Sequence, residues 1–363
     1  MMEMKELVKQ MDVATFQRNL VEWFLKNQRN LPWRQNKDPY KIWVSEIMLQ
    51  QTKVDTVIPY FERFVSKFHT VYDLAKADEE EVLKAWEGLG YYSRARNLQT
   101  AVREVVQKYD GVVPNTEEEI STLKGVGPYT TGAILSIAYN LPVPAVDGNV
   151  MRVFSRLFAL HDDIAKPKTR KKIEEIVREV IDQNRPGDFN QAIMELGALV
   201  CTPTSPACLL CPVQEHCQAF HQGLESTLPI KTRKKSTKEV SLSVSIMKNE
   251  QNQYIVEKRP DTGLLAKLWE FPNVSTLRKT KNEQKNFQKA LEKLYDVDIQ
   301  KINYEYEFEH IFSHLKWKIS VYSSEYKGTI IESERKRLVT KEELLQLPFP
   351  VPYQKMIKKI ILK

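Results

Sequence analysis

The segment CTPTSPACLLCPVQEHC, residues 201–217, contains all four cysteines of the chain. Six, two and five residues separate Cys201, Cys208, Cys211 and Cys217. Cysteines gathered in one short segment favour metal ligation over disulfides, and four thiolates suit either a zinc ion or an iron–sulfur cluster. The spacing alone leaves that choice open. In either case the metal would hold together a segment that has no hydrophobic core of its own.

The sequence changes character on either side of this segment. Residues 12–200 carry apolar side chains three and four positions apart, which predicts a mainly helical domain. Residues 221–239 are polar and basic, so we interpret them as a linker. Beyond the linker the apolar period becomes two, which predicts strands at 240–247, 253–259, 302–308 and 315–322, with helices at 282–295 and 341–347. We therefore expect a helical domain at 1–220 and an α+β domain at 240–363.

The length of 363 residues also favours two domains. Residues 1–220 carry 27 basic and 29 acidic side chains, so the net charge of +7 arises entirely beyond residue 220. Such an excess fits a polyanionic partner such as DNA, and it would serve solubility equally well. Because no apolar run reaches signal-peptide length or the roughly 20 residues that span a bilayer, we expect a cytoplasmic protein without a membrane partner. We also expect a monomer.

A second informative segment is LKGVGPYTTGAI, residues 123–134. Gly125 and Gly127 lie between two helical patterns, and Pro128 suits the first position of the second helix. Such a turn exposes backbone amides at the positive end of a helix dipole, which makes a site for an anion. An ordinary connection between two helices would have the same glycines.

Together, the CX6CX2CX5C segment and the glycine hairpin resemble the endonuclease III and MutY family of DNA glycosylases. The resemblance implies a helix-hairpin-helix glycosylase fold, a [4Fe-4S] cluster held by the four cysteines, and a hairpin in which Gly125 and Gly127 grip a DNA phosphate without reading sequence. Residues 240–363 resemble a Nudix-like, MutT-related domain. The region NEQKNFQKALEKLYD, residues 282–296, lacks the carboxylates of the Nudix motif, so nucleotide hydrolysis is not expected.

Tyr129 distinguishes two branches of this family. The lyases related to endonuclease III carry a lysine at this point of the hairpin, where its amine attacks the sugar. The tyrosine makes the chain more similar to the monofunctional adenine glycosylases of the MutY branch. A bifunctional glycosylase and lyase is the rival interpretation, and a non-catalytic iron–sulfur protein that binds DNA is a second.

Two carboxylates fall on the catalytic motifs of the MutY branch. Glu46 lies in IWVSEIMLQQT, residues 42–52, where an exposed position on a buried helix is the alternative. Asp147 lies in VPAVDGNV and would also suit an N-cap. The resemblance implies that a neutral Glu46 protonates adenine and that an ionised Asp147 stabilises an oxocarbenium-like sugar. It also implies that Asn149 is a partner of Asp147 and that Tyr129 hydrogen-bonds either Asp147 or the bound sugar.

The other residues that the resemblance implies would bind the extruded adenine, the surrounding DNA and the base opposite adenine. The resemblance implies an adenine pocket of Arg29, Leu31, Trp33 and Gln191. It implies DNA contacts from Gln51, Thr52, Leu89 and Tyr91, although Leu89 and Tyr91 would also fit a hydrophobic core. In the Nudix-like domain it implies that Phe312, Ser313 and His314 recognise 8-oxoguanine opposite adenine, where a polar turn is the alternative. The expected partner is double-stranded DNA that contains this mispair, or adenine opposite guanine.

Overall fold

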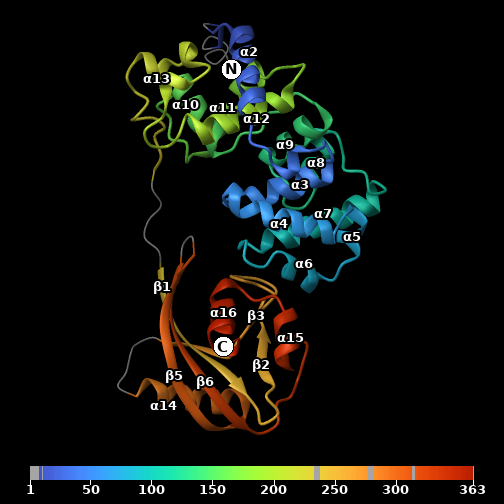
Figure 1. Ribbon diagram of the computed structural model, residues 1–363, viewed down its shortest axis with the longest axis vertical. Helices are drawn as coiled ribbons and strands as arrows, with labels where there is room; N and C mark the ends of the chain where they lie inside the picture. Colours follow the sequence, from blue (N-terminus) through green and yellow to red (C-terminus); the bar gives the residue numbers. More distant parts are fainter. Residues whose placement is uncertain (1–7, 10, 233–237, 277–281, 313–314, 363) are drawn as a thin grey trace. The chain divides into compact units, whose positions relative to one another are not determined.

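The computed structural model describes residues 8–9, 11–232, 238–276, 282–312 and 315–362 (Figure 1). The chain divides into two compact units. Unit 1 comprises Met1–Lys76 and Asn97–Arg233, and unit 2 comprises Ala77–Arg96 and Lys234–Lys363. None of the helices in the described ranges is long and apolar enough to cross a membrane.

Unit 1 is helical, as the period of its apolar residues predicts. Its described part contains no strand; the elements are α2 (Val13–Asn27), η1 (Pro32–Arg34), α3 (Pro39–Leu49), α4 (Val54–Lys67), α5 (Val71–Lys76), α7 (Ser93–Lys108), α8 (Glu117–Thr122), α9 (Pro128–Tyr139), α10 (Gly148–Leu157), α11 (Pro167–Val180), α12 (Pro186–Leu199), η2 (Cys208–Leu210), η3 (Gln214–His216) and α13 (Gln218–His221). The first residues of α7 belong to unit 2.

One apolar core joins α2 to helices that begin more than 120 residues after it ends. The residues that α2, α10 and α12 contribute include Phe16, Leu20, Phe24, Val150, Phe154, Phe189 and Ile193. Helix α9 approaches the backbone ahead of α10 closely, because a Cβ on Gly132 would lie 1.8 Å from the carbonyl oxygen of Pro144. Only glycine fits there, and the close contact brings α9 beside the start of α10.

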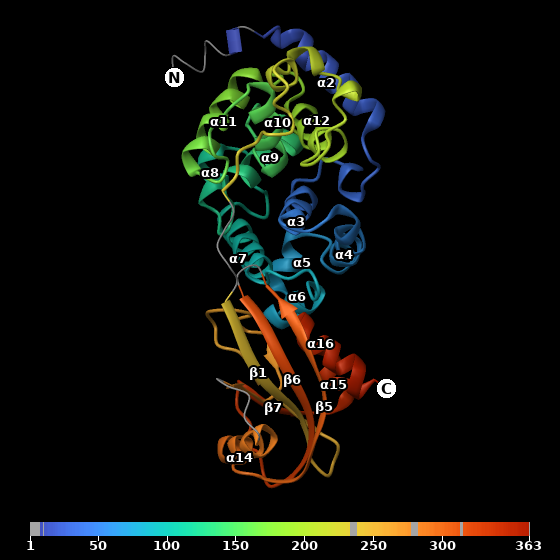
Figure 2. The same cartoon turned by 90° about the vertical axis from the view of Figure 1, so that its left-hand side faces the viewer.

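Unit 2 is built on one mixed sheet with the strand order β3-β2-β1-β6-β5. Figure 2 shows β1, β6 and β5 side by side. The strands are β1 (Lys238–Lys248), β2 (Tyr254–Lys258), β3 (Trp269–Glu270), β4 (Asn273–Thr276), β5 (Asp298–Ile311), β6 (Leu315–Lys327) and β7 (Lys336–Val339). Strand β1 pairs in parallel with β6, and β5 and β6 form a long antiparallel pair. The α+β prediction for this part of the chain is confirmed.

Successive residues of the long strands serve different cores, as their two-residue period requires. Ile246 and Val321 belong to a core that includes residues of α15 (Lys341–Gln346) and α16 (Val351–Met356), which the π-helical turn η4 (Ile357–Ile361) continues. Their neighbours Met247 and Tyr322 belong to a core with α14 (Glu283–Tyr295). The sheet is therefore covered on both faces.

The segment Ala77–Arg96 belongs with the sheet although it comes from the helical part of the sequence. It contains α6 (Glu79–Ala85), from which Glu80 pairs with Lys258 at 2.6 Å. The Glu87 carboxylate accepts a hydrogen bond from the amide of Phe349 at 2.8 Å. The units therefore do not coincide with the division that the sequence predicts.

The predicted linker also differs from a solvated tether over part of its length. Leu228 is buried, and its carbonyl accepts a hydrogen bond from Arg156 at 2.9 Å. Thr232 donates to Asp163 at 2.5 Å. Residues 221–232 thus pack on unit 1 through contacts that local composition does not reveal, and β1 begins at Lys238.

Candidate active site

A cavity of about 610 Å³ in unit 1 brings together segments far apart in the sequence. Glu46 and Asp147 both line it. The other predicted residues that line the same cavity are Arg29, Leu31, Trp33, Gln51, Thr52, Gly125, Gly127, Tyr129, Asn149 and Gln191. The sequence motifs therefore meet at one place in the fold.

Glu46 comes from a helix that is buried over most of its length. Helix α3 begins after Asp38, whose side chain caps it, and Glu46 is only 6% exposed. The exposed position considered for this residue is therefore wrong. Burial raises the pKa of Glu46 to about 7, and the negative charge of Asp147 adds to this effect, whereas the Tyr129 hydrogen bond and the Arg34 charge oppose it. A substantial fraction of Glu46 is thus protonated at neutral pH.

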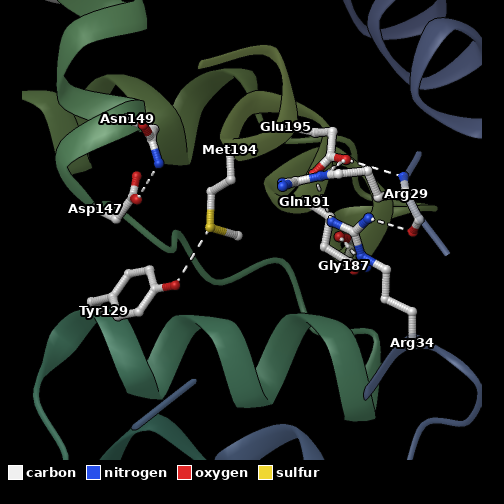
Figure 3. A network of polar contacts seen from close by, with 9 residues as sticks. All are labelled: Arg29, Arg34, Tyr129, Asp147, Asn149, Gly187, Gln191, Met194 and Glu195. Carbon is white, nitrogen blue, oxygen red and sulfur yellow. Dashed lines mark hydrogen bonds and ion pairs between the residues drawn. The ribbon is translucent and has the colours of Figure 1, made fainter. Parts of the chain in front are cut away.

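Tyr129 connects the hairpin to the buried carboxyl group. It is the second residue of α9, and its hydroxyl donates a hydrogen bond to Glu46 Oε2. The same hydroxyl lies 3.5 Å from the sulfur of Met194 (Figure 3). Burial raises the pKa of Tyr129 well above its ordinary value, so the phenol is neutral and remains a donor.

Asp147 serves as the N-cap of α10 and also faces the cavity. Its Oδ1 accepts from the Val150 amide at 2.8 Å, and its Oδ2 accepts from Asn149 Nδ2 at 2.9 Å. Burial raises the pKa of Asp147, whereas these two hydrogen bonds lower it. Asn149 is itself held by Arg152, which donates to Asn149 Oδ1 at 2.9 Å and to the Cys201 carbonyl at 2.8 Å. Capping and a place in the cavity are therefore compatible.

Another part of the cavity wall is an ionic network that the sequence did not indicate (Figure 3). Glu195 pairs with Arg29 at 2.8 Å and with Arg34 at 3.0 Å. Arg34 also donates to Gln191 Oε1 at 3.1 Å. Local sequence gives only the spacing: Glu195 follows Gln191 by four positions on α12, and Arg34 directly follows Trp33. Neither spacing shows that these side chains are paired in a cavity wall.

The glycine hairpin opens on the same cavity. Gly125 adopts a φ of +79°, and a Cβ there would lie 2.8 Å from the Cβ of Asn97, so both conformation and space favour glycine. Gly127 is the N-cap of α9, and Pro128 is its first residue. The N-terminus of α9 therefore borders the cavity and offers backbone amides to an anion.

The four cysteines line one small cavity of about 30 Å³ together with Arg156. Arg156 Nη1 donates to Cys201 Sγ at 3.2 Å. Burial raises the pKa of Cys211 to about 12, so a cation is needed to keep this thiol ionised at neutral pH. Within the described ranges, no three Cys, His, Asp or Glu side chains are grouped closely enough to hold a single metal ion. Four thiols around one small cavity are a donor set that suits thiolate ligation, either of a zinc ion or of an iron–sulfur cluster.

The remaining predicted residues lie in unit 2. Leu89, Tyr91 and Phe312 line a second cavity, of about 590 Å³. Leu89 is buried, whereas Tyr91 is 43% exposed and has a φ of +44°. Ser313 and His314 lie outside the described residues.

The sequence and structure of the chain match known base excision repair proteins. Residues 44–179 match the HhH-GPD superfamily of base excision DNA repair proteins, and residues 243–359 match the NUDIX domain. A solved thermostable thymine-DNA glycosylase is 26% identical with a TM-score of 0.54, and the match covers 59% of this chain and 99% of that one.

Relatives with similar sequences share one name. The adenine DNA glycosylase of Rattus norvegicus is 38% identical over 87% of this chain and 72% of its own length. That of Buchnera aphidicola subsp. Schizaphis graminum is 34% identical over 84% of this chain and 86% of its own length. The chain therefore belongs to the adenine DNA glycosylase family, enzymes of base excision DNA repair.

Proposed function

We propose that this enzyme removes adenine mispaired with 8-oxoguanine, or with guanine, and does not itself cut the DNA strand. The observation that carries the proposal is the meeting of Glu46 and Asp147 in one cavity, with Tyr129 bonded to the first and Asn149 to the second. The two carboxyl groups have different hydrogen-bond partners, which suits a division of labour between acid and stabilising anion.

In the proposed reaction the neutral carboxyl of Glu46 gives its proton to a ring nitrogen of the extruded adenine. The bond between the sugar C1′ and the base nitrogen then breaks, and its electron pair leaves with adenine. The Asp147 carboxylate stabilises the cationic sugar that remains. Water adds to C1′ and returns a proton to Glu46. Donation from Tyr129 orients the Glu46 carboxyl throughout.

The other residues of the first cavity would hold the extruded nucleotide. Leu31 and Trp33 are buried at its wall and offer apolar contact, while Arg29 and Gln191 offer polar groups to the base edge. Gln51 and Thr52 would contact the DNA beside the extruded base. The amides around Gly125 and Gly127 would bind a backbone phosphate, since phosphate contacts position a duplex without reading its sequence.

The second cavity would recognise the base opposite adenine. Phe312 lines it with Leu89 and Tyr91, so one cavity in unit 2 joins the predicted lesion-recognition loop to the predicted duplex contacts. Ser313 and His314 would complete that loop. We further propose that residues 240–363 carry lesion recognition and that residues 1–220 carry the glycosylase chemistry, apart from Ala77–Arg96, which belongs to unit 2. In a bacterium such an enzyme would act in the cytoplasm, at the nucleoid.

A base-excision assay tests this function directly. Duplexes that differ only in the base opposite adenine are incubated with the full chain, and abasic sites are revealed by alkali. We expect rapid release opposite 8-oxoguanine, slower release opposite guanine, and little opposite thymine. Equal release from all duplexes, or none from any, would contradict the proposal.

Tyr129→Lys tests the interpretation of the hairpin. A lysine amine near the sugar is expected to attack C1′, form a Schiff base and permit strand cleavage, which the wild type lacks. Trapping with borohydride, followed by gel electrophoresis, measures the covalent adduct. Tyr129→Phe, which has no amine, is the matched control. Strand breaks by the wild type without alkali would favour the bifunctional rival instead.

Cys201, Cys208, Cys211 and Cys217 would hold a [4Fe-4S] cluster, which would supply a rigid cross-link for residues 201–217. Metal analysis of the purified chain is expected to find about four iron and four sulfide per chain. Cys211→Ala is expected to lose this iron and to lower the melting temperature, because the segment has little core of its own. One zinc per chain without sulfide would contradict the assignment.

A further inference from the structure

Glu195 is the centre of a hydrogen-bond network in the wall of the first cavity (Figure 3). Its side chain is only 2% exposed. Oε1 accepts from the backbone amide of Arg29 at 3.1 Å and from Arg29 Nε at 2.8 Å. Oε2 accepts from Arg29 Nη2 at 2.9 Å and from Arg34 Nη2 at 3.0 Å. A carboxylate has about four acceptor positions, so Glu195 has none left for a ligand.

The network also fixes the amide of Gln191. Arg34 Nε donates to Gln191 Oε1 at 3.1 Å, and Gln191 Nε2 donates to the Gly187 carbonyl at 3.2 Å. Arg34 Nη1 donates to the Arg29 carbonyl at 3.1 Å. The groups that this wall can still offer to a ligand are therefore mostly N–H donors. They belong to the guanidinium groups of Arg29 and Arg34 and to the amide of Gln191.

We propose that Glu195 is a positioning residue for base selection, because it holds Arg29, Arg34 and Gln191 as a wall of hydrogen-bond donors. This inference rests on the proposed function and adds to it how the enzyme discriminates adenine from purines with an amino group at C2. Adenine presents unprotonated ring nitrogens, which accept hydrogen bonds from such a wall. A purine with an amino group at C2 brings further N–H donors against it and loses those hydrogen bonds.

Charge explains why one carboxylate is needed for this arrangement. Two guanidinium groups that converge on the same wall repel each other unless an anion lies between them. Replacing Glu195 by glutamine removes the anion and two acceptor positions while keeping the size of the side chain. Arg34 would then be free to leave Gln191, and the released Gln191 Oε1 would become an acceptor for an amino group at C2.

The test compares excision of adenine and of 2,6-diaminopurine, each opposite 8-oxoguanine, by the full chain under single-turnover conditions. In Glu195→Gln, the ratio of the two rate constants is expected to fall by about tenfold, since one misplaced hydrogen bond changes a rate by about that factor. Lesion-duplex affinity is expected to stay within about threefold. Glu179→Gln, on the exposed side of α11, is the matched control and should leave the ratio unchanged.

Arg34→Lys provides a second variant that keeps the positive charge but loses the planar fork. It should lower the same ratio, and thermal melting verifies that both variants fold. A loss of rate with an unchanged ratio in the folded variants would overturn the inference and leave Glu195 with a structural role only. If the wild type released neither base, the proposed function itself would fail, so the two failures are distinguishable.

Discussion

Glu46→Gln is expected to reduce adenine release by about a thousandfold, within the range that a general acid contributes. The amide keeps the size of the side chain and still accepts the Tyr129 hydrogen bond, but it has no proton to give to the base. Single-turnover excision from an adenine·8-oxoguanine duplex measures the loss. Binding to the same duplex should remain close to that of the wild type. Turnover within about tenfold of the wild type would rule out Glu46 as the acid.

The same variant is expected to be more stable than the wild type at pH 8. Because burial raises the pKa of Glu46 to about 7, the folded protein holds a proton there that the unfolded chain releases near its ordinary value of 4.5. Below pH 4.5 the group is protonated in both states and does not reduce the free energy of unfolding. As pH rises from 4.5 to about 7, the free energy of unfolding falls by up to about 3 kcal/mol. Urea unfolding at pH 8 and pH 4 measures the difference, with the exposed Glu62→Gln as control.

Asp147→Asn is expected to lower excision by a factor of about a hundred to a thousand, because it removes the anion that faces the cationic sugar. Asparagine is itself a good N-cap, so α10 should keep its start and the fold should persist. Circular dichroism and the melting temperature report on that point, and single-turnover kinetics report on the chemistry. A cap substitution without a catalytic role would instead change stability and leave the rate nearly unchanged.

Much of the site follows from sequence because each functional residue lies in a short segment with its own local pattern. The segments around Glu46 and Asp147 resemble family motifs, from which both residues are predicted, and the structure places both in one cavity. Their local patterns alone would equally fit an exposed helix position and an N-cap. Glu195 and Arg34 could not be assigned in this way. Buried and solvated ion pairs consist of the same residue types, and only tertiary packing decides whether a given pair is buried.

The fold shows the same division between local and distant causes. The long strands β1 and β6 have enough residues to show their alternation, whereas β3 has two residues and β4 and β7 have four each. These short strands exist because they pair with β1 or β2, and no local period reveals them. Likewise α6 has the pattern of any amphipathic helix, and its place in unit 2 depends on distant partners such as Lys258.

The dependence of the single-turnover excision rate on pH tests the central claim most directly. If a protonated Glu46 with a pKa of about 7 supplies the proton, the rate should be nearly constant well below pH 7, fall to half near pH 7, and approach a tenfold decline per pH unit at higher pH. The residual rate of Glu46→Gln should lack this decline. A wild-type rate that stays level or rises between pH 7 and 9, on a duplex that remains bound, would contradict the account.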